Sequence, residues 1–285
     1  MTRGRLRRAA ALVALACALS ACGTLSVEEE KKLGAQYQQE LRKQLTFVRD
    51  PVSVTYVRQF GAGLAAAARP SPFEFRFYLV EDEEINAFAI PGGAVYVNTG
   101  LLLAVKNGAE LAGVLGHEMG HVTARHIAKN ANTQRNTGFV ANIFYIAVAI
   151  LTGNPYLANA GGLAGQVAGQ AFITTFTRDA EREADLLGVE TMTNAGWNPD
   201  AMVTMFETLK KEGGHSGMPQ FLSSHPATDE RIQNVRKEIE KYPNSDTLRL
   251  DDAKLPIIQE RLKLIIGTDR EKEDKSDDDD SDDKK

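Results

Sequence analysis

The stretch GVLGHEMGHVTARHIA, at residues 113–128, constrains this chain more than any other part of its sequence. His117 and His121 are four residues apart, so on a helix both imidazoles project from one face and can bind one metal ion. Glu118 lies about 100° around that helix from His117, where it can reach a water at the metal without being a ligand. This H-E-x-x-H arrangement predicts two zinc ligands and a general base.

A catalytic zinc site needs three protein ligands and one open position, so the chain must supply one more ligand. His126 is the nearest histidine. The elongated pattern H-E-x-x-H-x-x-G-x-x-H, however, requires glycine and histidine at the positions where Ala124 and Ile127 stand. Because no glycine is present to turn the chain back, we expect His126 to be a polar position near the end of the helix.

A second stretch, TRDAEREADLLG at residues 177–188, offers the missing ligand. Glu181 and Asp185 are four residues apart on an expected helix. Glu181 can therefore bind the metal while Asp185 accepts a hydrogen bond from a metal-binding histidine. Glu183 is expected to pair with an arginine of the same helix. Spacing alone does not decide between Glu181 and Glu183, because a run of carboxylates on a helix is usually a solvated face.

The N-terminus has the three parts of a secretion signal. Four arginines precede an apolar segment at residues 9–19, which is too short to span a membrane, and LSAC follows at residues 19–22. This ending resembles the lipobox of bacterial lipoproteins, in which the cysteine is lipidated. We expect residues 1–21 to be a lipoprotein signal peptide and Cys22 to anchor the protein in a lipid bilayer. Gly23 in place of aspartate favours, by resemblance, the outer membrane facing the periplasm.

The rest of the chain divides by composition. Residues 22–50 are expected to form a polar linker and helix, residues 51–267 one folded domain of the α+β class, and residues 268–285 an acidic, disordered tail. Alternation in FEFRFYLVE predicts one strand, and residues 94–98 a second. From residue 109 onward the pattern is helical. A net charge of −5 argues against nucleic acid as a principal ligand.

Four stretches, in order, resemble the HtpX-type and CAAX-prenyl-protease-type zinc metallopeptidases, a gluzincin family: NAFAIPGGAVYVNTGLL, HEMGH, EREAD and HPATDERI. The resemblance implies that Glu181 is the third ligand of a single zinc ion and that Asp185 supports a ligating histidine. It places His225 and Arg231 beside the metal. It also implies a mostly helical, zincin-like domain with a small antiparallel sheet, whose edge strand borders the active-site cleft.

The resemblance further implies an envelope-anchored metalloendopeptidase of the lipid-anchored, soluble-domain branch, which hydrolyses unfolded or misassembled envelope proteins. Glu118 is then the general base, assisted by His225, Asp185 and Arg231. Substrates are expected to add a strand to a sheet edge at residues 94–98. The alternatives are a protease-like chaperone or assembly factor with latent activity, in contact with the outer-membrane assembly machinery, and a purely structural zinc protein.

Two roles for His225 stay open. It can occupy the fourth zinc position and silence the enzyme, or it can donate a hydrogen bond to the oxyanion, and we favour donation. The expected loop around it, between the glycines at residues 213–214 and a helix that begins near Pro226, allows it to move.

The apolar segment at residues 139–151 is about half a bilayer span in length. The sequence that follows is rich in glycine and alanine, which suits close helix packing. We therefore expect a buried helical hairpin beside the site, not a membrane span.

Overall fold

The computed structural model describes residues 25–133, 176–216 and 220–267. The lipobox with Cys22, the apolar segment at residues 139–151 and the acidic tail lie outside these ranges, so the expectations about them stay predictions. Among the helices of the described ranges, none has both the length and the apolar character that crossing a membrane requires.

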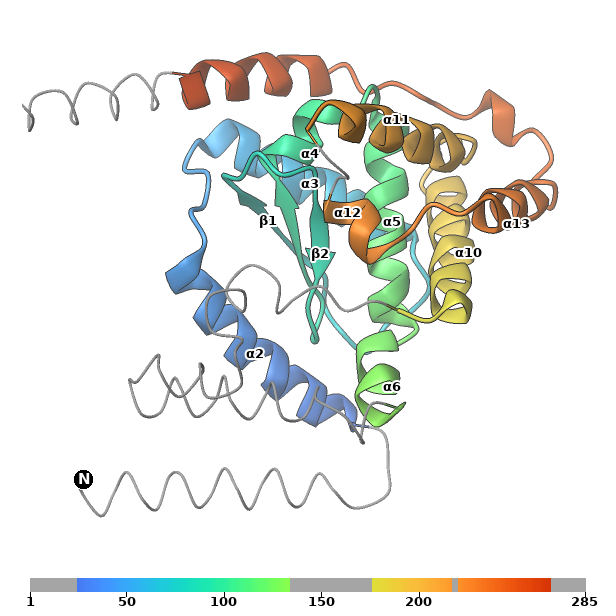
Figure 1. Cartoon of the computed structure of the whole chain (residues 1–285), viewed down its shortest axis with the longest axis horizontal. Coiled ribbons are helices and arrows are strands. Elements are labelled where there is room, and N and C mark those ends of the chain that lie inside the picture. The colour runs from blue at the N-terminus through green and yellow to red at the C-terminus, as the bar shows by residue number, and fades with distance from the viewer. Residues whose placement is uncertain (1–24, 134–175, 217–219, 268–285) are drawn as a thin grey trace, which may run out of the picture.

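The described residues are mostly helical, with a small sheet early in the chain (Figure 1). This confirms the α+β, zincin-like class expected from the sequence. The chain begins with α2 (Val27–Gln44), α3 (Pro51–Ala67) and the strands β1 (Arg76–Val80), β2 (Ala87–Ala89) and β3 (Ala94–Asn98). It continues through α4 (Thr99–Ala104), α5 (Gly108–Thr123), α6 (His126–Thr133), α10 (Arg178–Asn194), α11 (Ala201–Ser216), α12 (Gln220–Ser224), α13 (Asp229–Ile239) and the 3-10 turn η2 (Ser245–Thr247). A further helix covers residues 255–267.

The three strands lie in the order β1-β3-β2, with β3 in the middle. β1 runs parallel to β3, whereas β2 runs antiparallel to it, with Phe88 opposite Tyr96. The sheet is therefore mixed, which corrects the expected antiparallel sheet. The expectation that residues 94–98 form the edge is also wrong, because β1 and β2 cover both sides of β3. Alternation identifies a strand, but only long-range pairing decides its neighbours.

Glycines allow α5 and α10 to approach closely enough to share one site. A Cβ on Gly120 of α5 would lie 2.7 Å from the carbonyl oxygen of Ala184 on α10. A Cβ on Gly188 of α10 would lie 3.1 Å from the backbone nitrogen of His117. Because both positions lack a side chain, the histidine-bearing face of α5 lies directly against the carboxylate-bearing face of α10.

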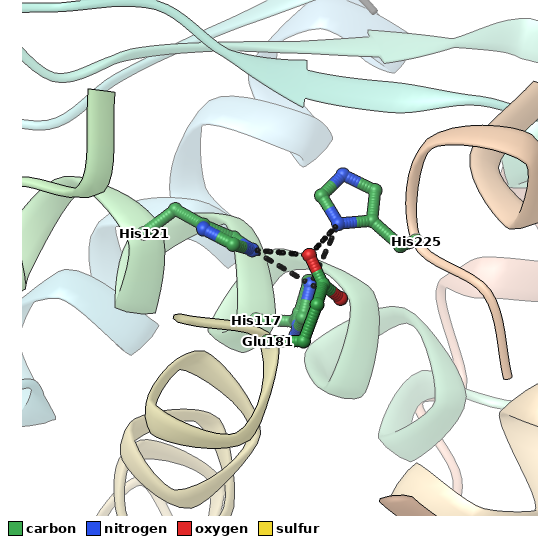
Figure 2. Close-up of side chains that lie close together, drawn as sticks. All are labelled: His117, His121, Glu181 and His225. Atoms are coloured by element: carbon green, nitrogen blue, oxygen red, sulfur yellow. Dashed lines mark hydrogen bonds and ion pairs between the residues drawn. The ribbon is translucent and has the colours of Figure 1, made fainter. Parts of the chain in front are cut away.

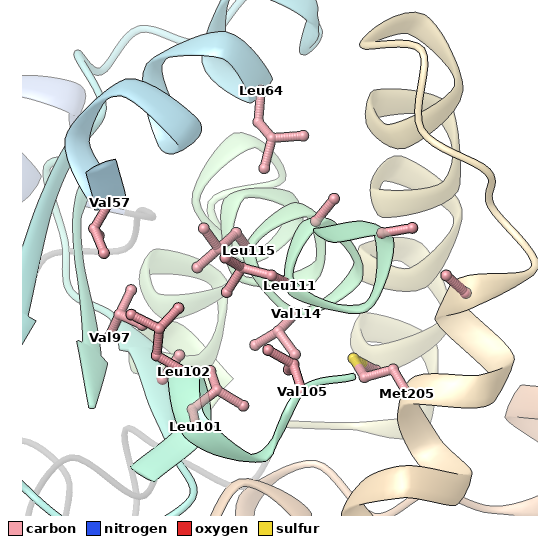
Figure 3. Packing of buried hydrophobic residues seen from close by; sticks show 14 of the residues in the cluster. Val57, Leu64, Val97, Leu101, Leu102, Val105, Leu111, Val114, Leu115 and Met205 are labelled. Atoms are coloured by element: carbon pink, nitrogen blue, oxygen red, sulfur yellow. The ribbon is translucent and has the colours of Figure 1, made fainter. Parts of the chain in front are cut away.

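The hydrophobic core holds α5 in place from its other faces. Figure 3 shows Leu111 and Leu115 of α5 packing with Leu64 of α3, Val97 of β3 and Met205 of α11. These side chains are almost completely buried. Each contributes roughly 1.5–3 kcal/mol through the apolar surface that it removes from water. The helix that carries the predicted zinc ligands is therefore a rigid platform.

Helix α2 packs on the outer side of the sheet. Leu41 of α2 joins Ile90 and Tyr96 in a second apolar cluster. Gly34 contacts the turn after β2 so closely that a Cβ there would lie 1.9 Å from the carbonyl oxygen of Pro91. The first turn of α2 lies near the end of α5, where Glu30 pairs with Arg125 at 2.8 Å. The segment after the expected anchor is thus tied to the domain.

Candidate metal centre

Four buried side chains converge where α5 and α10 meet. His117 and His121 lie on α5, and Glu181 lies on α10. His225 is the residue that follows α12 (Figure 2). One ligand atom from each lies within 4.8 Å of all the others, and we call these four side chains the metal group. The structure thus brings together the three ligands expected from the sequence and adds His225 to them.

The distances among these atoms fit a shared cation. The Nε2 atoms of His117 and His121 are 3.0 Å apart, and Nδ1 of His225 is 3.1 Å from Nε2 of His117. Oε1 of Glu181 is 3.4 Å from Nε2 of His121 and 2.9 Å from Nδ1 of His225. Lone pairs this close repel one another unless a cation or shared protons lie between them. Imidazole and carboxylate are ligands that zinc prefers, so the residues present fit a zinc ion.

His117 is oriented by a buried carboxylate. Its Nδ1 lies 2.9 Å from Oδ1 of Asp185, so this N–H donates to Asp185 and Nε2 faces the metal group. Arg231 donates to both oxygens of Asp185, at 2.8 and 2.7 Å, and its Nη1 lies 2.8 Å from Oε2 of Glu181. Burial alone would raise the pKa of Asp185, but the guanidinium outweighs it and lowers that pKa. Asp185 and Arg231 therefore lie where the resemblance placed them.

His121 is enclosed more by rings than by charges. Its imidazole stacks on Phe176, with ring centroids 4.0 Å apart. Burial lowers the pKa of His121 well below its ordinary value, because an imidazolium would lose its hydration there. Burial thus favours the neutral imidazole, which is the form that binds a metal.

His126 is not a member of the metal group, but it contacts His121, which is a member. Its Nδ1 lies 2.9 Å from Nδ1 of His121, and its Nε2 lies 3.0 Å from Oε2 of Glu183. The expectation that the chain cannot turn back without glycine is wrong, because Arg125 adopts a left-handed conformation with φ 56°. Glu183 pairs with His126 and Lys129, not with an arginine of its own helix.

Glu118 lies beside the metal group and outside it. Its Oε2 accepts a hydrogen bond of 2.9 Å from the backbone N–H of Ala89 on β2. Its Oε1 makes no hydrogen bond within the described ranges and lies 3.5 Å from Nε2 of His225. Burial raises the pKa of Glu118. One oxygen held by a backbone N–H and one oxygen without a hydrogen bond suit a group that accepts and returns a proton. The Ala89 contact could not be read from the sequence, because its donor is a backbone group.

The backbone around His225 differs from the expected mobile loop. The glycines at residues 213–214 lie within α11, and His225 closes the short helix α12 through its N–H to the carbonyl of Phe221 at 2.8 Å. The next helix, α13, begins at Asp229, after the N-cap Thr228, and not near Pro226. The glycine pair is therefore part of a helix and not of a loop, and the movement of His225 stays a prediction.

Comparison with known proteins agrees with this geometry. The model of peptidase family M48 matches residues 52–239. The beta-barrel assembly-enhancing protease of Yersinia pestis is 32% identical over 244 residues, which are 84% of this chain and 50% of that protein. The metalloprotease LoiP of Escherichia coli (strain K12) is 29% identical over 226 residues, which are 75% of this chain and 81% of LoiP.

A shorter match is to a mitochondrial protein. The mitochondrial metalloendopeptidase OMA1 of Arabidopsis thaliana is 33% identical over 167 residues, which are 59% of this chain and 32% of that protein. The chain spans about half the length of the beta-barrel assembly-enhancing protease that it matches. The similarity to that protein thus covers one part of it and not the whole.

Proposed function

The chain belongs to peptidase family M48, and from that membership we propose that it is a zinc-dependent metalloendopeptidase. In this proposal His117, His121 and Glu181 hold one zinc ion per chain. The observation that carries the proposal is the position of Glu118, a buried carboxylate on α5 next to the ligand His117, whose Oε1 makes no hydrogen bond within the described ranges and lies 3.5 Å from Nε2 of His225. A purely structural zinc site needs no such carboxylate.

A zinc ion held by His117, His121 and Glu181 would supply Lewis acidity, which would lower the pKa of a water molecule and polarise the carbonyl of the substrate. Glu118 accepts a proton from that water at Oε1 as the new C–O bond forms. The N–H of Ala89 holds Oε2 in place during this transfer. Glu118 then passes the proton to the leaving amine as the peptide C–N bond breaks. Asp185 and Arg231 take no part in the proton transfer. They orient His117 and Glu181.

In the same proposal, substrates bind in extended form along β2, an edge strand of the sheet. The hydrogen bonds of the β2–β3 hairpin make Phe88 and Tyr96 a hydrogen-bonded pair. The backbone groups of Ala87 and Ala89 therefore point away from β3, toward the side where Glu118 lies. A strand added there is recognised through its backbone and not its sequence. Such recognition suits unfolded proteins of varied sequence.

The position of His225 supports a latent state of the same site. Its Nδ1 lies about as close to Nε2 of His117 and to Oε1 of Glu181 as the Nε2 atoms of His117 and His121 lie to each other. Four protein ligands leave a zinc ion no open position, so the enzyme is silent until His225 moves away. This geometry favours capping over the oxyanion donation that the sequence led us to prefer. The capped site is also compatible with a protease-like chaperone or assembly factor, which binds substrates more often than it cuts them.

The lipobox and the names of the relatives support a proposal for the substrates and the location. The signal and Cys22 support a lipoprotein of the bacterial envelope, in the outer membrane and facing the periplasm. A relative named for β-barrel assembly supports unfolded or misassembled envelope proteins as substrates. The same name supports contact with the outer-membrane assembly machinery.

The test separates catalysis from metal binding. Zinc content and cleavage of casein are measured for the wild type, for Glu118→Gln and for Glu207→Gln, an exposed glutamate on α11 that serves as the control. We expect Glu118→Gln to keep its zinc and to lose cleavage, because the amide cannot accept the proton of the water. The control should behave as the wild type. Unchanged cleavage by Glu118→Gln would contradict the proposal.

A further inference from the structure

We propose that His126 and Glu183 form a positioning relay that holds the zinc ligand His121. The inference rests on the proposed zinc site, but it is tested by metal binding and not by proteolysis. It concerns the two side chains next to the site that the mechanism above does not use. Both lie behind His121 as seen from the metal group, because His126 contacts Nδ1 of His121 and the metal group contacts Nε2.

The turn between α5 and α6 brings His126 to this place. α5 ends at Thr123, and Arg125 adopts the left-handed conformation, which is unfavourable for a residue with a Cβ. Arg125 is held in that conformation by the buried carboxylate of Glu30 at 2.8 Å and by the carbonyl of Leu25. The conformation is therefore supported by contacts from α2 and from the segment that precedes it. It directs the first side chain of α6 back against the site.

The contacts run in one line from the site to the surface. Nδ1 of His121 is 2.9 Å from Nδ1 of His126, and Nε2 of His126 is 3.0 Å from Oε2 of Glu183. Nζ of Lys129 follows at 3.4 Å from the same oxygen. His126 is only 3% exposed, whereas the side chain of Glu183 is 52% exposed. A buried imidazole thus connects a metal ligand to a solvated carboxylate.

Only one arrangement of hydrogens satisfies this line together with a zinc ion. Because Nε2 of His121 must offer its lone pair to the metal, Nδ1 of His121 carries the hydrogen and donates it. His126 must then accept at Nδ1, which places its own hydrogen on Nε2. That N–H donates to Glu183. The carboxylate therefore selects the tautomer of His126, and His126 selects the metal-binding tautomer of His121.

The two histidines of α5 are thus supported in different ways. His117 donates directly to Asp185, which is buried and held by Arg231. His121 reaches its carboxylate through a second imidazole, and that carboxylate lies at the surface. Partners of this kind orient a ligand and raise its basicity. If His126 only filled space, a change at the half-exposed Glu183 would leave zinc affinity unaffected.

The main experiment measures the zinc dissociation constant of the full chain by competition with a chelator. We expect His126→Phe, which keeps a ring but removes both nitrogens, to raise the constant about tenfold to a hundredfold. Glu183→Ala should raise it at least threefold. The matched control is Glu190→Ala, a glutamate of the same helix that pairs with Arg69 at the surface, away from the metal group. The control should bind zinc as the wild type does.

A conservative variant distinguishes the relay from packing. The amide oxygen of His126→Asn stands where Nδ1 stood and can still accept from His121, so zinc affinity should recover part of the loss seen in His126→Phe. No recovery would overturn the relay. An increase of less than threefold in Glu183→Ala would overturn it as well. Since Glu183 is half exposed, this second variant carries the test even if His126→Phe does not fold.

The tautomers give an independent readout in the zinc-loaded wild type. Long-range ¹H–¹⁵N spectra should show His126 protonated at Nε2 and bare at Nδ1, and His121 protonated at Nδ1. A proton on Nδ1 of His126 would overturn the proposal. The outcomes also separate this inference from the proposed function. A wild type that binds no zinc refutes both, whereas tight zinc binding in all variants refutes only the relay, and zinc binding without proteolysis refutes only the peptidase.

Discussion

The backbone N–H of Ala89 donates a hydrogen bond of 2.9 Å to Oε2 of Glu118. This contact joins the edge strand β2 to the carboxylate that we propose as the general base. The strand along which a substrate would bind therefore also orients the group that receives the proton. The spacing between the two depends on the full length of the glutamate side chain.

Glu118→Asp tests that dependence. The shorter side chain cannot keep the bond to Ala89 and also present an oxygen to the site, so we expect kcat to fall by about 10²–10⁴-fold. Zinc content should stay unchanged, because Glu118 is outside the metal group. The measurement is kcat and KM on casein together with zinc content. An aspartate variant that cuts as fast as the wild type would show that the Ala89 contact is dispensable.

Glu181→Ala tests the choice of the third ligand. We expect this variant to lose zinc at stoichiometric metal, because it removes a ligand atom and also leaves the buried guanidinium of Arg231 without one partner. Glu183→Ala should still bind one zinc ion at saturating metal, with the weaker affinity described above. Zinc content after dialysis is the measurement. The reverse result, with zinc lost only from Glu183→Ala, would contradict the assignment.

His225→Ala separates the two roles of that histidine. Since Nδ1 of His225 lies among the ligand atoms, we expect the variant to cut faster than the wild type, as the fourth zinc position is opened. Oxyanion donation predicts the opposite, a loss of about a hundredfold or more. Rates are compared at equal zinc occupancy on an unfolded envelope protein. Equal rates would exclude both roles.

Gly120→Ala tests the close approach of α5 and α10. The new Cβ would lie 2.7 Å from the carbonyl oxygen of Ala184, so the helices must separate, at a cost of about 1–3 kcal/mol in stability. The control is Gly63→Ala on α3, where a Cβ meets nothing within 4 Å. That control should gain roughly 0.5–1 kcal/mol from helix propensity. Thermal unfolding of both variants is the measurement, and equal melting temperatures would contradict the packing argument.

Arg261→Gln tests how the last described helix is attached. Arg261 donates to both oxygens of Asp50, at 2.7 and 2.5 Å, and Asp50 also caps α3 by accepting from the N–H of Ser53. The bonds from Arg261 hold the pKa of Asp50 below its ordinary value. A lowered carboxyl pKa stabilises the fold above the pKa of the unfolded chain, about 3.9, and this contribution is lost as the pH falls below that value.

The wild type should therefore be more stable than Arg261→Gln at pH 7, and the difference should shrink by pH 3. Denaturant unfolding at both values measures it. A difference that does not change with pH would mean that the pair does not act through the charge of Asp50. Arg58→Gln, a change of an exposed arginine on α3, provides a charge-matched control.

The sequence by itself determined the features that depend on local geometry. Residues four apart on a helix share a face whatever surrounds them, so His117 and His121 were certain to point the same way once the stretch was helical. The same rule paired Glu181 with Asp185. Alternation likewise predicted the strands. The family motifs added His225 and Arg231, and the structure brings both to the site.

Tertiary structure alone decided which of these groups meet and how. Spacing could not separate Glu181 from Glu183, and what separates them is the crossing of α5 and α10 at Gly120 and Gly188. β3 is the central strand, because it pairs with both β1 and β2 and leaves these two at the edges of the sheet. His126 reaches the site only because contacts from α2 hold Arg125 in a left-handed turn. Each of these outcomes depends on packing between segments far apart in the chain, and periodicity carries no information about such contacts.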